Sequence, residues 1–357
     1  MILACLGAVA GWFLLDAAIF RTHLYPSVLA PDSSAGTFEL TLRAERLALR
    51  RLGDNLICTI GNSRFAYSPK LANQMTPETG YIFRHAGVPG SDLRNWYYML
   101  RDLDPQANRY QAIVIGLPSY DDEDDALDRA DDMRSMHFVV YRLRLSDTWD
   151  FAKSFRTPEK RWEAFRGTLL KGFALQRDVH AFLEHPKDRI AYVHLAHQGY
   201  ESWMADYVET KRNLAGFSVD WTTGKAVYPP NLDPGVQSTL EYMVKWPPVT
   251  EHVAEYNRLW LGRILDRYQR SRTRIVFVRL PRSPTPRPEH PPVASTVRGF
   301  AKRPGVMLYD EHHFDYLEHP ELFKDAVHLN YDGIHLFTAD VARGIARLLG
   351  APRPAAH

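Results

Sequence analysis

Residues 56–64 read Leu56-Ile57-Cys58-Thr59-Ile60-Gly61-Asn62-Ser63-Arg64, a short apolar run that ends in a glycine turn. Four later runs have the same form and also end in turn residues: 81–83, 112–115, 275–278 and 306–309. Continuous β-branched runs of this length are typical of strands that are covered on both faces, as in a parallel sheet. The sequence therefore predicts five parallel strands.

Helical patterns separate these runs, at 71–75, 92–103 and 252–270, and a last amphipathic pattern covers about 334–349. Alternating strands and helices predict a three-layer α/β domain. The stretch between the third and fourth strands is far longer than a crossover needs. We interpret about 121–250 as a mainly helical insertion at the carboxyl edge of the sheet, with helical segments at 158–183 and 200–213.

The N-terminal residues 2–20 are apolar or small apart from Asp16, and Arg21 follows them. About 20 apolar residues span a bilayer, so residues 1–22 are predicted to hold an uncleaved membrane-anchor helix. Asp16 weakens this interpretation because a carboxylate is costly at membrane depth. The alternative is a buried N-terminal helix of a soluble protein. Behind this segment we expect a linker and helical lead-in at 23–54 and a catalytic domain at 55–350.

Charge and cysteine usage argue against two classes of protein. The net charge is +2 and the basic residues form no block, so nothing indicates nucleic-acid binding. The two cysteines are Cys5 in the apolar N-terminus and Cys58 in the first predicted strand. A disulfide between these positions is not expected, so the chain is not a disulfide-stapled scaffold.

Ser63 follows the first predicted strand and precedes a helix-like stretch. A serine there stands at the carboxyl end of the sheet, and free N–H groups of a following helix would stabilise an oxyanion. For an isolated serine in this place, a helix N-cap is the ordinary alternative.

A second polar segment lies before the last predicted helix and reads Asp325-Ala326-Val327-His328-Leu329-Asn330-Tyr331-Asp332-Gly333. Asp and His three residues apart in a turn can bring the carboxylate to one imidazole nitrogen. The other nitrogen is then free to accept a proton from a serine. Strand one and this segment can meet at the carboxyl edge of an open sheet. We therefore predict a triad of Ser63, His328 and Asp325.

The Gly61-Asn62-Ser63-Arg64 segment and the Asp325–Gly333 segment together resemble the SGNH (GDSL-like) hydrolase and acyltransferase superfamily. They are similar in particular to its membrane-anchored branch associated with multispanning MBOAT-type acyltransferases, which includes DltD-like and alginate-acetylation-like proteins. The resemblance covers 55–120 and 272–349, together with the anchor segment and the stretch 29–36 behind it. It implies a flavodoxin-like three-layer fold with a parallel sheet of order 2-1-3-4-5.

The resemblance also implies an oxyanion hole made by the N–H groups of Ser63 and of a glycine after strand two, for which Gly90 is the best match. Glycine suits this role because its backbone can approach a substrate closely. The family's third block usually supplies an asparagine after strand three, and this chain has Gly116-Leu117-Pro118-Ser119-Tyr120 instead. Two alternatives stay open: Ser119 is the substitute donor, or the site uses only the two backbone donors.

The expected activity is acyl transfer through an acyl-Ser63 intermediate, with O-acetylation of an exopolysaccharide or cell-envelope glycan as the first choice. The resemblance implies a single-pass anchor in the cytoplasmic membrane and a catalytic domain on the extracytoplasmic side. It also implies an MBOAT-type partner that supplies the acyl group; no cofactor or metal is expected. Two alternatives stay open: a carbohydrate esterase or deacetylase, and a non-catalytic envelope scaffold or glycan-binding protein with a decayed site.

Overall fold

The computed structural model describes residues 2–22, 24–122, 132–208, 211–245, 251–286, 288 and 294–352. The chain divides into two compact units. The first unit contains Met1–Ala44 and Arg129–Glu201, and the second contains Glu45–Asp128 and Ser202–His357. The first unit thus combines the N-terminal residues with part of the long insertion. Most of the acidic stretch that opens this insertion, 123–131, lies outside the described residues.

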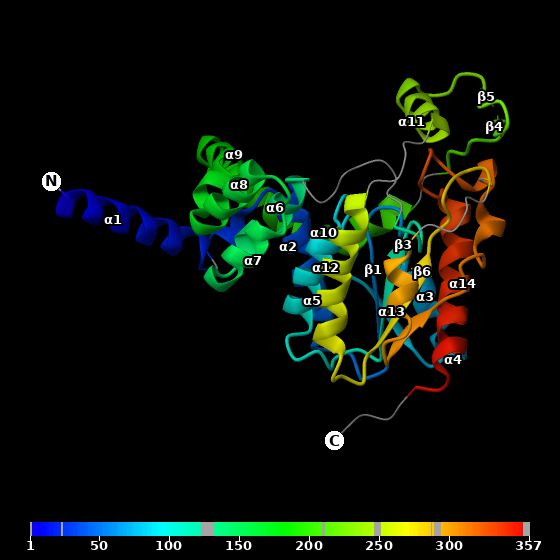
Figure 1. The fold of residues 1–357 in the computed structure, drawn as a ribbon, viewed down its shortest axis with the longest axis horizontal. Helices are drawn as coiled ribbons and strands as arrows, with labels where there is room; N and C mark the ends of the chain where they lie inside the picture. Colours follow the sequence, from blue (N-terminus) through cyan, green and yellow to red (C-terminus); the bar gives the residue numbers. More distant parts are fainter. Residues whose placement is uncertain are drawn as a thin grey trace. The chain divides into compact units, whose positions relative to one another are not determined.

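The second unit contains a five-stranded parallel sheet, as predicted (Figure 1). Its strands are β1 (Leu56–Ile60), β2 (Ile82–His85), β3 (Ala112–Leu117), β6 (Arg274–Arg279) and β7 (Val306–Leu308). Every residue of β1 and β3 is buried, which explains why these runs lack polar alternation.

The predicted strand order was 2-1-3-4-5, for a chain with five strands. The structure has seven strands in its described part, and the order along the sheet is β2-β1-β3-β6-β7. The two differ from the fourth place on because the insertion contains two strands that the sequence did not predict. These strands, β4 (Ser218–Asp220) and β5 (Lys225–Val227), form a separate antiparallel hairpin. In each of them the side chains alternate between exposed and half-buried. Short strands without a continuous apolar run give no strong sequence signal.

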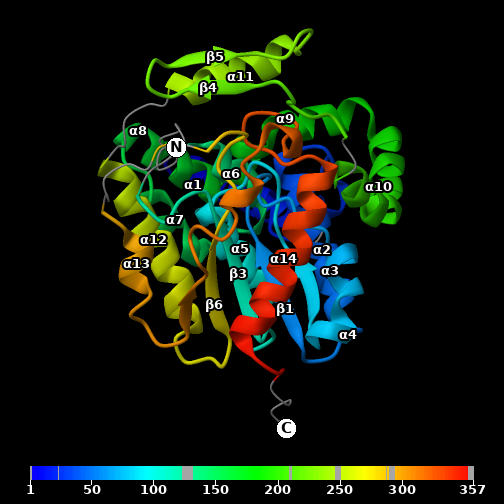
Figure 2. The ribbon, with the colours of Figure 1, turned by 90° about the vertical axis from the view of Figure 1, so that its right-hand side faces the viewer.

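Helices cover both faces of the sheet and complete a three-layer α/β arrangement. The helices α5 (Leu93–Leu103) and α12 (Glu251–Tyr268) lie on one face, and α3 (Pro69–Gln74), α4 (Thr76–Thr79) and α14 (Tyr331–Leu349) lie on the other (Figures 1 and 2). The short α13 (Thr296–Phe300) contacts α12, and α11 (Pro234–Lys245) follows the β4–β5 hairpin. Side-chain caps set two helix starts: Asp92 and Asn95 form a capping box at α5, and Asn330 accepts from Gly333 N at α14.

The first unit is helical. It contains α1 (Ile2–Phe20), the greater part of α2 (Ser34–Leu49), α6 (Arg134–Val139), α7 (Thr148–Lys153), α8 (Pro158–Leu169), α9 (Lys171–Glu184) and most of α10 (Pro186–Val208). The segment predicted as one helix at 158–183 is two helices, because Leu170 adopts an extended backbone with φ −123° and ψ 93°. The second predicted segment, 200–213, is shifted: helix α10 covers its beginning and ends at Val208.

The predicted anchor is not found as a spanning helix. Among the described residues, no helix combines the length and the apolarity that crossing a membrane requires. In α1 the carboxylate of Asp16 is 6% exposed and accepts hydrogen bonds from the backbone N–H groups of Lys171 and Gly172, at 3.1 and 2.7 Å. Asp16 thereby binds the N-terminus of α9, where free N–H groups favour a negative charge. The end of α1 is therefore packed inside the first unit.

Candidate active site

Ser63 lies in a tight turn directly after β1. The side chain of Asn62 folds back and accepts from Arg64 N at 3.0 Å, and the carbonyl of Asn62 accepts from Phe65 N at 3.0 Å. The expectation that Ser63 stands at a helix N-terminus is wrong, because α3 begins only at Pro69. The N-cap alternative is wrong as well: Ser68 caps α3 and accepts from Leu71 N.

The predicted triad residues come together as expected. The Nε2 atom of His328 lies 2.8 Å from Ser63 Oγ, and its Nδ1 atom lies 2.9 Å from both carboxylate oxygens of Asp325. Ser63 and His328 are 265 positions apart in the sequence, so only the fold brings them into contact. The expectation that Ser63 Oγ lies within hydrogen-bond reach of a His328 ring nitrogen is confirmed.

A tight local turn holds His328 and Asp325 together. Asp325 Oδ1 also accepts from the backbone N–H groups of Val327 and His328, at 3.0 and 2.9 Å. Lys324 N donates to the carbonyl of His328 at 2.9 Å, and Phe323 pairs with Leu329 in an antiparallel bridge. This bracing fixes the imidazole plane relative to the carboxylate, which is the orienting role that a triad requires.

The protonation states follow from these contacts. Burial alone would raise the pKa of Asp325, but the hydrogen bond and charge of His328 and the two backbone N–H groups outweigh it and lower the pKa. The carboxylate is therefore ionised at neutral pH and can only accept, so Nδ1 of His328 carries the proton. The lone pair of Nε2 then faces Ser63 Oγ and can take the serine proton.

The loop after β2 packs directly on the turn that carries Ser63. The carbonyl of Gly61 accepts from Val88 N at 3.2 Å, and a Cβ added at Gly87 would lie 2.9 Å from that carbonyl and 2.4 Å from His85 Nε2. Only glycine fits at position 87 without displacing these atoms. Gly90 has φ +76°, in the left-handed region that favours glycine.

His85 is a buried structural residue beside this loop. Burial, with a smaller contribution from the charge of Arg84, lowers the pKa of His85 to about 4. The neutral ring lies 2.8 Å through Nδ1 from Thr59 Oγ1 and packs edge-on against Phe65. It thus supports both the turn that carries Ser63 and the loop that carries Gly90.

Ser119, the predicted substitute donor, lies in the loop after β3. Its Oγ atom accepts from Asp121 N at 3.0 Å, which leaves the hydroxyl hydrogen free for another acceptor. Within the described part of the chain, no hydrogen bond joins Ser119 to the triad. Ser119 and Gly90 can therefore act as oxyanion donors only toward a bound substrate.

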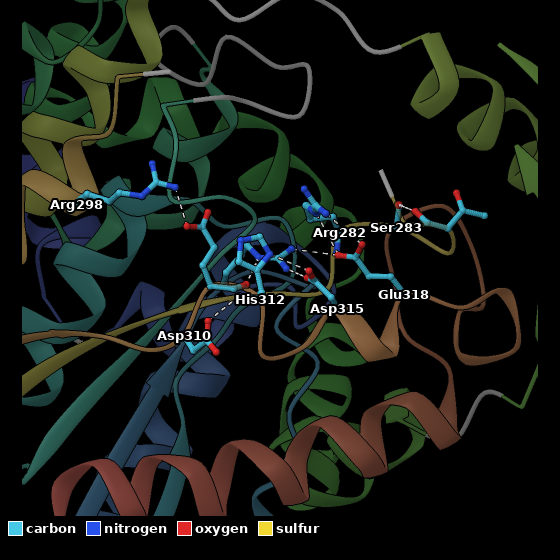
Figure 3. A network of polar contacts seen from close by, with 10 residues as sticks. Arg282, Ser283, Arg298, Asp310, His312, Asp315 and Glu318 are labelled. Carbon is cyan, nitrogen blue, oxygen red and sulfur yellow. Dashed lines mark hydrogen bonds and ion pairs between the residues drawn. The ribbon is translucent and has the colours of Figure 1, made fainter. Parts of the chain in front are cut away.

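A buried charged network, which the sequence did not predict, lies at the ends of β6 and β7 (Figure 3). Glu318 is 0% exposed and accepts from Arg279 Nη1 at 3.1 Å, from Arg282 Nε at 3.2 Å and from Arg282 N at 2.9 Å. Asp315 pairs with Arg279 on the other side. The carbonyl of Arg282 accepts from Arg64 Nη2 at 3.1 Å, so the network connects to the residue that follows Ser63.

Comparison of the chain with protein-family models and with curated protein sequences found no match. The resemblance to the SGNH superfamily therefore rests on the two motifs, and the site must be judged by its geometry.

Proposed function

We propose that this protein is a serine-dependent acyltransferase that O-acetylates an exopolysaccharide or another cell-envelope glycan. The observation that carries the proposal is the continuous hydrogen-bonded chain from Ser63 Oγ through His328 to Asp325. Such a series of hydrogen bonds activates a serine for nucleophilic attack. A serine that only caps a helix or lies on the surface does not require a His–Asp pair. Because these hydrogen bonds are intact, they also argue against a decayed site in a scaffold protein.

In the proposed mechanism, His328 Nε2 takes the proton of Ser63 while Oγ attacks the carbonyl carbon of an acyl donor. The N–H groups of Ser63 and Gly90 and the hydroxyl of Ser119 are the proposed oxyanion donors. The imidazolium gives its proton to the leaving group, and an acyl-serine remains. His328 then removes the proton of a sugar hydroxyl while the sugar oxygen attacks the acyl carbon. The bond from this carbon to Ser63 Oγ breaks, and Oγ regains the proton from His328.

We propose that the protein acts at the extracytoplasmic face of the cytoplasmic membrane, attached through the apolar helix α1. An MBOAT-type acyltransferase in that membrane would supply the acyl group. What supports attachment to a membrane is that α1 exposes large apolar side chains on several sides. The partner and the glycan acceptor follow from the motif resemblance alone.

Hydrolysis is the second candidate, in which water replaces the sugar hydroxyl and the protein is a carbohydrate esterase or deacetylase. One observation favours it: the side chains of His328 and Asp325 keep 23% and 27% of their surface exposed, so water reaches the base. The same triad serves both reactions, because the two differ only in the second nucleophile.

Product analysis separates the two. The full chain is incubated with an activated acetyl ester, with and without an oligosaccharide acceptor, and free acetate and acetylated oligosaccharide are quantified by mass spectrometry. Transfer predicts that the acceptor speeds ester consumption and that most acetyl groups end on the sugar. Acetate as the sole product at all acceptor concentrations would instead identify a hydrolase. The Ser63→Ala variant serves as the blank for both reactions.

A further inference from the structure

The first unit exposes a contiguous group of aromatic side chains on α7, α8 and α9. Trp149 and Trp162 are 59% and 61% exposed, and Phe173 is 46% exposed. Trp162 stacks on Phe165 with a ring distance of 5.8 Å, and Phe165 meets Trp149 edge-on at 6.3 Å. Single exposed apolar residues are ordinary on a soluble protein, but connected aromatic groups mark an interaction surface.

Cationic side chains border these rings. Lys153 Nζ lies 4.7 Å from the centre of the Trp149 ring, and the guanidinium of Arg166 lies 5.3 Å from that of Phe173. Over the whole of α7 to α9, residues 148–184, the sequence contains seven Lys and Arg against five Asp and Glu, so the segment as a whole is only weakly basic. The positive charge beside the rings therefore comes from the side chains of Lys153 and Arg166 themselves.

The α9 end of this aromatic–cationic face (Trp149, Lys153, Trp162, Phe165, Arg166 and Phe173) lies next to the base of α1, because α9 packs on α1. Phe173 directly follows Gly172, whose N–H binds Asp16 and where an added Cβ would lie 3.2 Å from the ring of Phe20. Before Asp16, α1 exposes large apolar residues on several sides: Leu3, Leu6, Val9, Trp12, Leu14 and Leu15. Figure 1 shows α1 extending away from the other helices of this unit. Phe173 thus lies near the point where the exposed part of α1 begins.

We infer that the aromatic–cationic face binds the headgroup layer of an anionic phospholipid membrane, while the exposed part of α1 enters the acyl region. Tryptophan rings prefer the membrane–water interface, and lysine and arginine beside them attract anionic headgroups. Binding of a helix to a membrane grows with its buried apolar area and with electrostatic attraction to anionic lipids, and the face adds the second contribution to the first. The inference rests on the proposed membrane location and adds the residues and the lipid class.

The test is co-sedimentation of the full chain with vesicles of phosphatidylcholine, alone or with roughly one third phosphatidylglycerol. Wild type is expected to bind the anionic vesicles more tightly, and more weakly as salt rises. The double variant Trp149→Ser/Trp162→Ser and the single variant Lys153→Glu should each bind anionic vesicles at least ~10-fold more weakly. The matched control is Tyr242→Ser, which removes a 50% exposed aromatic ring outside this face and should bind like wild type.

Binding is measured apart from turnover, so failure of the acyltransfer proposal leaves this test intact. Thermal midpoints of the variants show whether each is folded. If the tryptophan variant does not fold, Lys153→Glu still tests the inference. Equal binding of wild type and both face variants would overturn the inference and leave α1 as the lipid contact. Equal binding to neutral and anionic vesicles, or none to either, would overturn it too; no binding would point to a protein partner for this face.

Discussion

Ser63→Ala is expected to lower turnover of an activated ester by at least ~10⁴-fold, because it removes the hydroxyl that contacts His328 Nε2 and that we propose as the nucleophile. The free energy of unfolding should change by no more than about 1 kcal/mol, since the lost interaction is one partly exposed hydrogen bond. The measurement is steady-state ester hydrolysis, paired with urea denaturation of the same preparations.

The chain offers a matched control five residues away. Ser68 caps α3 through its hydroxyl, so Ser68→Ala should cost roughly 0.5–2 kcal/mol of stability and leave turnover nearly unchanged. Ser63→Ala should thus lose activity and keep stability, whereas Ser68→Ala should lose stability and keep activity. If Ser63→Ala kept substantial turnover, the nucleophile assignment would be wrong.

The second large effect concerns stability. Glu318→Ala is expected to lower the free energy of unfolding by about 3–5 kcal/mol, because it leaves two arginines without their shared buried carboxylate. Asp315 still pairs with Arg279, so the lower end of this range is expected. Urea denaturation measures the change directly.

An exposed ion pair provides the comparison. Glu78 pairs with Arg343 at 3.2 Å, and the two side chains are 58% and 47% exposed. Solvent screens such a pair, so Glu78→Ala should change stability by less than about 1 kcal/mol. Similar losses for Glu318→Ala and Glu78→Ala would show that burial of the Glu318 network contributes nothing.

The sheet was predictable because its strands are buried on both faces. Runs such as 56–60 and 112–115 must be apolar throughout, and this pattern is visible without any structure. The triad was predictable for a different reason: Asp325 and His328 lie in one turn, and their spacing is a local feature. Ser63 followed from its place after the first strand.

Other features depend on contacts that no sequence pattern encodes. Glu318 and Arg282 are 36 positions apart, and nothing in either local sequence indicates that they pair. The turn of Asn62 delays the start of α3, so the serine that caps this helix is Ser68 and not Ser63. The close approach of Gly87 to the carbonyl of Gly61 likewise has no sequence signal, because it arises only when β1 and β2 are adjacent.

The N-terminal helix shows how composition can mislead about packing. Residues 2–20 are apolar enough to predict a membrane anchor, but hydropathy does not reveal that Asp16 is bound by the first N–H groups of α9. A buried carboxylate with two backbone donors is no longer an obstacle to an apolar environment. The same residue that weakens the anchor prediction therefore joins α1 to the rest of its unit.

The central claim is that His328 activates Ser63 as a nucleophile, and covalent labelling with a fluorophosphonate probes it most directly. The full chain and the His328→Ala variant are treated in parallel, and the modified peptide is located by mass spectrometry. We predict a single label on Ser63 in the wild type and almost none in His328→Ala, where no base takes the serine proton. Equal labelling of Ser63 in both proteins, or no labelling of folded wild type, would contradict the account.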